Sequence, residues 1–363
     1  MRVLFVSRGP IRLPLARELR RKWDAVREQM EFRVVAGGEG EDAEFRLVRP
    51  RRSLDGVAFY AALPARIARE LRAFRPEAVV AQGAHETAAA LVARGVAGIE
   101  TAVIADVHGD WRAPTRLYGS PLRGLLSPAA DRVADAALRR ADGVRTVTAY
   151  TTGLVRALGL EPTDEFPAYM DFESFLASPV APLPDAPRAL FVGVLERYKN
   201  ADGLAEAWRR AAPRVPEATL HVVGDGTLAR VVERLTAELP SVVWSRRLDQ
   251  REVAAALDAS TCLVLPSRSE GMGRVVIEAF CRGRGVIGSR VGGIRDLVEE
   301  DVNGVLVEPG DTNALAEALV RLLTDGELAQ RLSAAARESV ARWTITPEEF
   351  ARRLRALVER VRG

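Results

Sequence analysis

Short apolar runs alternate with amphipathic helical patterns along almost the whole chain, and this alternation restricts the fold more than any other feature of the sequence. In the first half, the apolar runs are residues 2–10, 32–37, 78–83 and 101–109. Helical patterns lie between them, as at residues 58–74 and 85–94. Parallel strands need long crossover connections, which are usually helices. The first half is therefore expected to form a parallel sheet covered by helices.

A second series of the same kind follows a proline-dense segment at residues 179–187. Its apolar runs are residues 188–194, 218–226, 241–245, 261–267, 284–293 and 303–310. Helical patterns separate most of these runs, as at residues 201–212, 228–238, 251–258 and 274–282. The runs lack polar alternation, which is typical of strands that are buried on both faces of a sheet.

A length of 363 residues favours about two domains. We therefore expect an α/β protein with two Rossmann-like, doubly wound parallel-sheet domains that face each other across a cleft. The domains are residues 1–178 and 188–346, and residues 179–187 are the linker. The last helical segment, residues 347–363, could pack on either domain, and we expect it on the first. Such sheets bind ligands at the carboxyl ends of their strands, so the chemistry is expected in the loops that follow strands.

Composition excludes several classes of protein. The formal net charge is only +3 and no zinc-finger or RNA-recognition motif occurs, so no nucleic-acid partner is expected. The two cysteines, Cys262 and Cys281, cannot build a disulfide framework or a cysteine-rich metal site, and they suit a reducing cytosol. No signal-peptide core and no run of about 18 apolar residues is present. We expect a soluble, cytoplasmic protein.

Residues 267–280 place two glutamates around a glycine-containing turn between an apolar run and a helical pattern. The turn consists of four residues: Gly271, Met272, Gly273 and Arg274. The free N–H groups and the helix dipole at such a turn favour a phosphate. Glu278, one helical turn further on, suits a ribose diol, and Glu270 can hold hydroxyls on the other side. The alternative is a capped helix with solvated acids.

Two common nucleotide-binding motifs are missing. No G-x-G-x-x-G follows the first apolar run, so a dinucleotide-dependent dehydrogenase is not indicated. No G-x-x-x-x-G-K-[ST] sequence occurs either, which excludes a P-loop nucleotide site of the usual kind.

Residues 266–319 resemble the E-x7-E region of the retaining family-4 glycosyltransferases of bacterial type, which have the two-domain GT-B fold. A weaker resemblance continues over nearly the whole chain. It implies that Glu270 lies beside the donor sugar, that Glu278 binds the nucleotide ribose, and that the backbone of residues 271–274 cradles the diphosphate. Family members usually carry Phe where this chain has Met272.

Residues 191–200 are similar to the family segment that carries a donor-site lysine. Lys199 falls on that lysine, which in the family neutralises the diphosphate and assists its departure. Of the 52 basic residues in the chain, only Lys22 and Lys199 are lysines, so a retained lysine here is notable. The family's arginine is replaced by Val194. Arg197 can supply the missing charge, and the alternative is a solvated loop arginine.

Residues 105–111 are similar to the family loop with an active-site histidine. The resemblance implies that His108 contacts the donor sugar, and Asp110 and Trp111 follow as candidate acceptor contacts. Gly9 in the first turn and Gly224 after a second-half strand match further donor-site glycines.

The resemblance implies a hexosyltransferase that moves a sugar from a UDP- or GDP-sugar to a hydroxyl acceptor with retention of configuration, without a metal or another cofactor. A nucleotide-sugar epimerase, a sugar-phosphate transferase and a non-catalytic nucleotide-sugar-binding protein are the alternatives. The basic helical segment 12–28 can contact an anionic inner membrane face peripherally, but in a chain so rich in arginine a solvated polar face is the favoured explanation. The sequence leaves open the base, the sugar, the acceptor and the oligomeric state.

Overall fold

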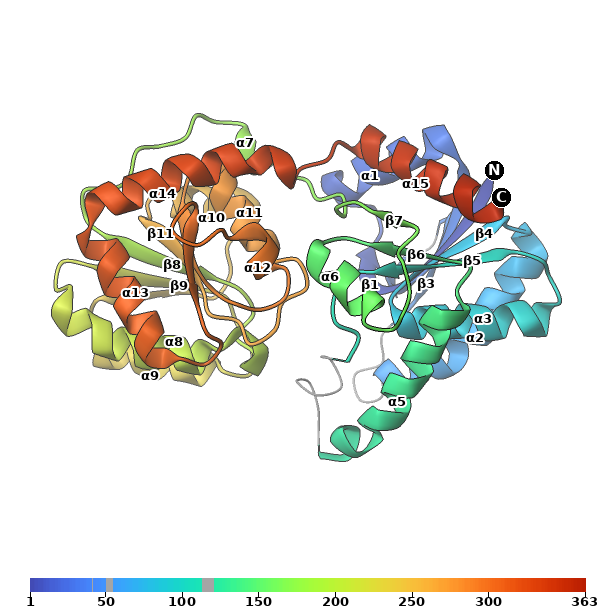
Figure 1. Cartoon of the computed structure of the whole chain (residues 1–363), viewed down its shortest axis with the longest axis horizontal. Helices are drawn as coiled ribbons and strands as arrows, with labels where there is room; N and C mark the ends of the chain where they lie inside the picture. Colours follow the sequence, from blue (N-terminus) through green and yellow to red (C-terminus); the bar gives the residue numbers. More distant parts are fainter. Residues whose placement is uncertain (41, 50–54, 113–120) are drawn as a thin grey trace. The chain divides into compact units, whose positions relative to one another are not determined.

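The computed structural model describes residues 1–40, 42–49, 55–112 and 121–363, and these residues form two compact units. Unit 1 comprises Met1–Met170 and Ile345–Gly363, and unit 2 comprises Asp171–Thr344. Each unit is a parallel sheet with helices on both faces (Figure 1). The prediction of two doubly wound α/β domains is confirmed.

Unit 1 contains a seven-stranded sheet in the order β3-β2-β1-β4-β5-β6-β7. Its strands are β1 (Arg2–Arg12), β2 (Glu31–Glu39), β3 (Phe45–Val48), β4 (Ala78–Gln82), β5 (Ala102–Val107), β6 (Gly143–Thr146) and β7 (Asp164–Glu165). Its helices are α1 (Arg17–Gln29), α2 (Asp55–Phe74), α3 (Ala84–Ala97), α5 (Pro121–Arg140), α6 (Ala149–Arg156) and α15 (Pro347–Arg362).

The core of unit 1 has a part on each face of the sheet, because successive side chains of a strand point to opposite faces. Val3 faces a cluster with side chains of α1 and α15, whereas its neighbour Leu4 faces a cluster with α2 and α3. Helix α15 begins with Pro347 after Thr346, whose side chain caps the Glu349 N–H. It lies beside α1, so the C-terminal segment packs on unit 1 (Figure 1).

Unit 2 contains a six-stranded sheet in the order β10-β9-β8-β11-β12-β13. Its strands are β8 (Arg188–Val192), β9 (Thr219–Val223), β10 (Val242–Ser245), β11 (Cys262–Leu265), β12 (Gly285–Ser289) and β13 (Gly304–Val307). Its helices are α7 (Glu173–Leu176), α8 (Ala201–Ala211), α9 (Ala229–Glu238), α10 (Gln250–Asp258), α11 (Arg274–Cys281), α12 (Ile294–Leu297), α13 (Thr312–Thr324) and α14 (Gly326–Ser339). Short 3₁₀ helices are η1 (Arg197–Lys199), η2 (Ala212–Arg214) and η3 (Val340–Arg342).

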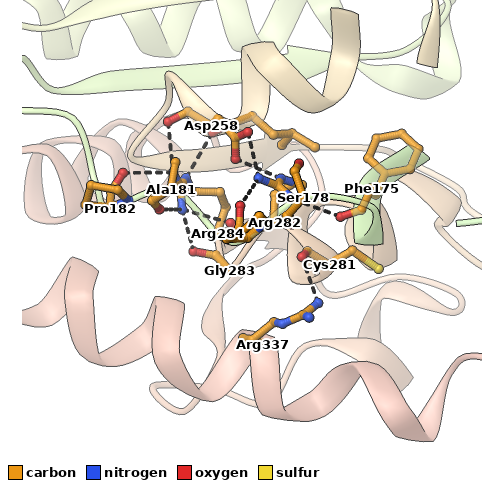
Figure 2. A network of polar contacts seen from close by, with 12 residues as sticks. Phe175, Ser178, Ala181, Pro182, Asp258, Cys281, Arg282, Gly283, Arg284 and Arg337 are labelled. Atoms are coloured by element: carbon orange, nitrogen blue, oxygen red, sulfur yellow. Dashed lines mark hydrogen bonds and ion pairs between the residues drawn. The ribbon is translucent and has the colours of Figure 1, made fainter. Parts of the chain in front are cut away.

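The proline-dense segment 179–187, expected to be a linker, lies within unit 2. Two fully buried arginines hold the start of this segment (Figure 2). Arg282 donates to the carbonyls of Ser178 and Pro179, and Arg284 donates to the carbonyls of Ala181 and Pro182. Because these guanidinium groups satisfy successive backbone oxygens, the segment is fixed to the α10–α11 side of the unit.

Candidate functional site

The strand order of unit 2 marks its candidate site. The chain runs from β8 outward to β9 and β10, then returns to the other side of β8 as β11. Ligands of open parallel sheets bind at such a switch point, outside the carboxyl ends of the two strands. Lys199 lies in the loop after β8 and Glu270 lies in the loop after β11, so the sheet brings these two predicted site residues together.

Lys199 and Glu270 form an ion pair through Nζ and Oε2. The two loops are also joined through their backbones, because the Arg268 N–H donates to the Tyr198 carbonyl at 2.7 Å. Lys199 is only 9% exposed. The buried ammonium and the partly buried carboxylate hold each other in place and form a fixed charge pair at the switch point.

Asn200 and Arg268 support this pair, and the sequence analysis did not identify either residue. Asn200 has a left-handed backbone, with φ of 59°, and its side-chain oxygen accepts hydrogen bonds from Arg268 at 2.8 and 3.0 Å. The pairing joins the β8 and β11 loops a second time. Asparagine tolerates positive φ better than most residues, and this tolerance is the signal that could have drawn attention to it.

The turn between β11 and α11 has the geometry of an anion site. Gly273, the N-cap of α11, has φ of +76°, a conformation that glycine adopts without strain. The first N–H groups of α11 have no acceptor within the helix and lie at the positive end of its dipole. The Gly293 N–H donates to the Gly271 carbonyl at 3.0 Å and so fixes the preceding peptide.

Glu278 lies one turn into α11 and is 8% exposed. Its Oε1 accepts a hydrogen bond from Nε of Arg274 at 2.8 Å. Arg274 also donates to the Asp171 carbonyl at 3.4 Å. Arg274, which the sequence left without a defined partner, therefore neutralises the buried Glu278 carboxylate.

The loop after β8 contacts the loop after β9. Gly224 has φ of +145°, and a Cβ at this position would lie 1.9 Å from the Gly193 carbonyl oxygen, so only glycine fits. The Glu196 carboxylate accepts from the backbone and hydroxyl of Thr227 at 3.1 and 2.6 Å. Arg197 is exposed at the edge of this loop, as is Val194.

In unit 1, His108 follows β5 and is held by hydrogen bonds to two side chains. Its Nε2 lies 2.9 Å from Oδ2 of Asp106, and its Nδ1 lies 3.3 Å from the Gln82 amide nitrogen. These partners favour the tautomer in which Nε2–H donates to Asp106 and Nδ1 accepts from Gln82. The imidazole is therefore fixed in orientation at the carboxyl ends of β4 and β5.

Asp106 also pairs with Arg145, the residue directly opposite it on β6, at 2.6 Å. Arg145 is 1% exposed and donates to the carbonyls of Phe166 and Pro167, both at 2.9 Å. Burial alone would raise the pKa of Asp106, but the charges of Arg145, His108 and Lys22 prevail and lower it well below its usual range. Asp106 is therefore ionised at neutral pH, and its carboxylate contacts the imidazole of His108. The sequence analysis missed both Asp106 and Arg145.

Three other residues of unit 1 were predicted to belong to the site, and the structure shows what each of them contacts. Trp111, proposed as an acceptor contact, is 7% exposed and lies in a core cluster, where its indole N–H donates to Asp135 at 2.9 Å. Asp110 accepts from the Arg112 N–H at 2.9 Å. Gly9 does not lie in a turn after the first strand as expected, because β1 continues to Arg12 and carries an irregularity between Ser7 and Pro10.

Neither a metal-holding group of side chains nor a membrane-spanning helix occurs among the residues that the structure describes. Across residues 1–40, 42–49, 55–112 and 121–363, no group of three or more His, Cys, Asp and Glu side chains is placed to hold a metal ion. Within the same ranges, no helix combines the length and the apolar character needed to cross a membrane.

Both halves of the chain match known protein families. Residues 13–166 match the model described as "Glycosyl transferase 4-like domain", and residues 178–339 match "Glycosyl transferases group 1". Among curated proteins, the sulfoquinovosyl transferase SQD2 of Arabidopsis thaliana is 32% identical over 163 residues, which are 44% of this chain and 31% of that protein. The chain spans less than half the length of the curated relatives that it matches.

Solved structures share the whole fold. Sucrose-phosphate synthase from Thermosynechococcus elongatus superposes with a TM-score of 0.78 at 20% identity, over 99% of this chain and 98% of that one. Anabaena HepE in complex with UDP and glucose superposes with a TM-score of 0.73 at 18% identity, over 98% and 99% of the two chains. A glycosyl transferase 4-like match over residues 13–166 is thus followed by a group 1 match over residues 178–339, on the two-domain GT-B fold.

Proposed function

We propose that this protein is a retaining, metal-independent hexosyltransferase that moves a sugar from a nucleoside-diphosphate sugar to a hydroxyl acceptor. The observation that carries the proposal is the ion pair of buried Lys199 with Glu270 at the β8/β11 switch point, beside the N-terminus of α11. It combines a cation, an anion-binding helix end and a hydroxyl-binding carboxylate at the place where this fold binds ligands.

In the proposed complex, the diphosphate lies between Lys199 and the first turn of α11. Lys199 would exchange its contact with Glu270 for one with the phosphate, where an ammonium stabilises the negative charge that develops as the glycosidic bond breaks. Glu270 would then be free to accept hydrogen bonds from sugar hydroxyls. Glu278 would bind the ribose, and Arg197 and Gly224 would lie beside the rest of the nucleotide.

The proposed reaction needs no external base. The acceptor hydroxyl attacks the anomeric carbon on the face from which the diphosphate departs, and the departing phosphate oxygen takes its proton. One glycosidic bond forms as one bond to phosphate breaks, and the configuration is retained. His108, oriented by Asp106, would contact the donor sugar. Charge stabilisation comes from Lys199 and the helix N-terminus, so the proposal includes no metal.

UDP-sugars are the first donors to test, because HepE, which has the same fold as this chain, was solved with UDP and glucose. The experiment is to measure the melting temperature with UDP, GDP and their sugars, and then to follow release of nucleotide with and without simple hydroxyl acceptors. Binding should raise the melting temperature by mass action. If no nucleotide raises the melting temperature, the assignment of a nucleotide-sugar site to unit 2 is wrong. Binding without any turnover would instead indicate a non-catalytic binding protein.

A Glu278→Gln variant tests the ribose assignment. If the carboxylate accepts from the ribose diol, the wild-type protein should bind 2′-deoxy-UDP about tenfold more weakly than UDP, which corresponds to one charged hydrogen bond. The variant should discriminate between the two nucleotides by less than about threefold. Isothermal titration calorimetry gives all four dissociation constants. Equal discrimination by both proteins would place the ribose elsewhere, whatever the catalytic activity.

A further inference from the structure

The Lys199 ammonium has two competing partners in the proposed site, the Glu270 carboxylate and a diphosphate. In the structure it forms an ion pair with Glu270, and the two side chains are only 11% and 15% exposed. A diphosphate that binds Lys199 must therefore displace this carboxylate or lie beside it. Displacement leaves a largely buried carboxylate without its cation, and the other arrangement brings two anions together, so both weaken binding.

The backbone of both loops is fixed, so the two charges cannot move far apart. The Arg268 N–H donates to the Tyr198 carbonyl at 2.7 Å and joins the loop of Glu270 to the loop of Lys199. On its other side the Glu270 loop packs against Gly292, which has φ of +49° and where an added Cβ would lie 1.8 Å from the Glu270 carbonyl oxygen. A phosphate bound at Lys199 therefore stays close to the Glu270 carboxylate and is repelled by its charge.

The other cations of these loops do not compensate for this repulsion. Arg274 pairs with Glu278 at 2.8 Å, and Arg268 pairs with Asp202 at 3.2 Å. Arg197 is exposed, and solvent screens its attraction for a phosphate. On the buried side of these loops, a diphosphate thus meets ion pairs rather than uncompensated cations.

The sugar of a donor changes this balance, because its hydroxyls donate hydrogen bonds to a carboxylate. When the hydroxyls bind Glu270, the carboxylate keeps its hydrogen bonds after Lys199 turns to the diphosphate. A free nucleoside diphosphate offers Glu270 nothing in exchange, since its ribose diol is assigned to Glu278. The ion pair therefore opposes binding of the free nucleotide more than binding of the nucleotide-sugar.

We propose that the Lys199–Glu270 ion pair makes unit 2 select a nucleotide-sugar over the free nucleoside diphosphate, and so limits inhibition by the nucleotide that the reaction releases. This inference rests on the proposed function, in which Glu270 binds the donor sugar. After transfer, the sugar hydroxyls leave with the product. Glu270 then pairs with Lys199 again, and the diphosphate loses its cation.

The test compares UDP with UDP-glucose by isothermal titration calorimetry or, where the melting-temperature panel selects another donor, that nucleotide-sugar with its own nucleotide. The wild-type protein should bind the nucleotide about tenfold more weakly than the nucleotide-sugar. In Glu270→Gln, the affinity for the nucleotide should rise about tenfold, because the neutral amide competes poorly for the ammonium. The affinity for the nucleotide-sugar should change less than about threefold, since the released ammonium offsets the weaker sugar contact.

Glutamine keeps the size of the side chain and an oxygen that can accept from Lys199, so this variant should fold. Asp202→Asn is the matched control, because it removes a carboxylate from the start of α8 that pairs with Arg268 and not with Lys199. It should raise the nucleotide affinity by less than about threefold and leave the preference for the nucleotide-sugar unchanged.

Two results would overturn the inference while leaving the proposed function intact. In the first, Glu270→Gln loses the preference only because the nucleotide-sugar binds more weakly, which would make Glu270 a sugar contact alone. In the second, Glu270→Gln and Asp202→Asn raise the nucleotide affinity equally, which would be a general effect of charge. If no nucleotide binds to the wild-type protein or to either variant, the proposed function itself has failed, and the inference fails with it.

Discussion

A Lys199→Ala variant should transfer sugar about 100- to 1,000-fold more slowly than the wild-type protein, with the loss mainly in kcat. The ammonium stabilises charge that develops on the departing diphosphate, so its removal raises the barrier more than it weakens substrate binding. Steady-state kinetics with the donor found in the nucleotide panel measures this loss. A decrease below tenfold would contradict the assigned role.

The Lys199–Glu270 pair complicates this experiment, because removing the lysine leaves the Glu270 carboxylate largely buried without its cation. The single variant should therefore also lose stability. A Lys199→Met/Glu270→Gln double variant removes both charges and should recover most of the melting temperature. It should not recover activity. If the double variant regains transfer, the pair is structural rather than catalytic.

The site of unit 2 could be predicted because each of its residues follows an apolar strand. Lys199 and Glu270 are 71 positions apart, but β8 and β11 are neighbours, and ligand-binding loops collect at the carboxyl ends of such strands. The pattern of strands and helices was enough to place these loops. It could not show that the two side chains pair with each other.

The Asp106–Arg145 pair of unit 1 could not be predicted in the same way. The two residues are 39 positions apart, and their contact depends on β5 and β6 being adjacent with Asp106 opposite Arg145. β6 is only four residues long and carries an arginine, so its sequence resembles a polar connection. Pairing and register decide that this arginine is buried, and neither follows from a local pattern.

The prediction that residues 179–187 form a linker failed for the same reason, since it ignored contacts with residues far away in the sequence. The prolines favour an extended linker, but side chains from other parts of unit 2 bind this segment. Arg282 and Arg284 flank the glycine after α11, where an exposed turn is expected, and both are instead 1% exposed. Their partners in and before this segment are backbone carbonyls more than 100 positions earlier, so no local feature of either segment indicates the contact.

Arg282→Met should lower the free energy of unfolding of unit 2 by about 3–5 kcal/mol, the second large effect expected for this chain. Arg282 donates to both oxygens of Asp258, at 2.7 Å each, and to the carbonyls of Phe175, Ser178 and Pro179. Methionine fills a similar volume but leaves these acceptors unpaired (Figure 2). Urea unfolding followed by circular dichroism measures the loss.

Arg337→Met is the matched control, since Arg337 makes a single hydrogen bond in the same network, to the Cys281 carbonyl at 2.9 Å. It should cost about 1 kcal/mol. Hydrogen exchange then separates a local from a general effect. In Arg282→Met the hydrogen-bonded amides of Phe175, Leu176 and Ala177, within segment 175–182, should lose protection first, because the arginine holds this segment from the inside. Equal losses in the two variants, or unchanged exchange at 175–182, would show that packing rather than Arg282 fixes the segment to unit 2.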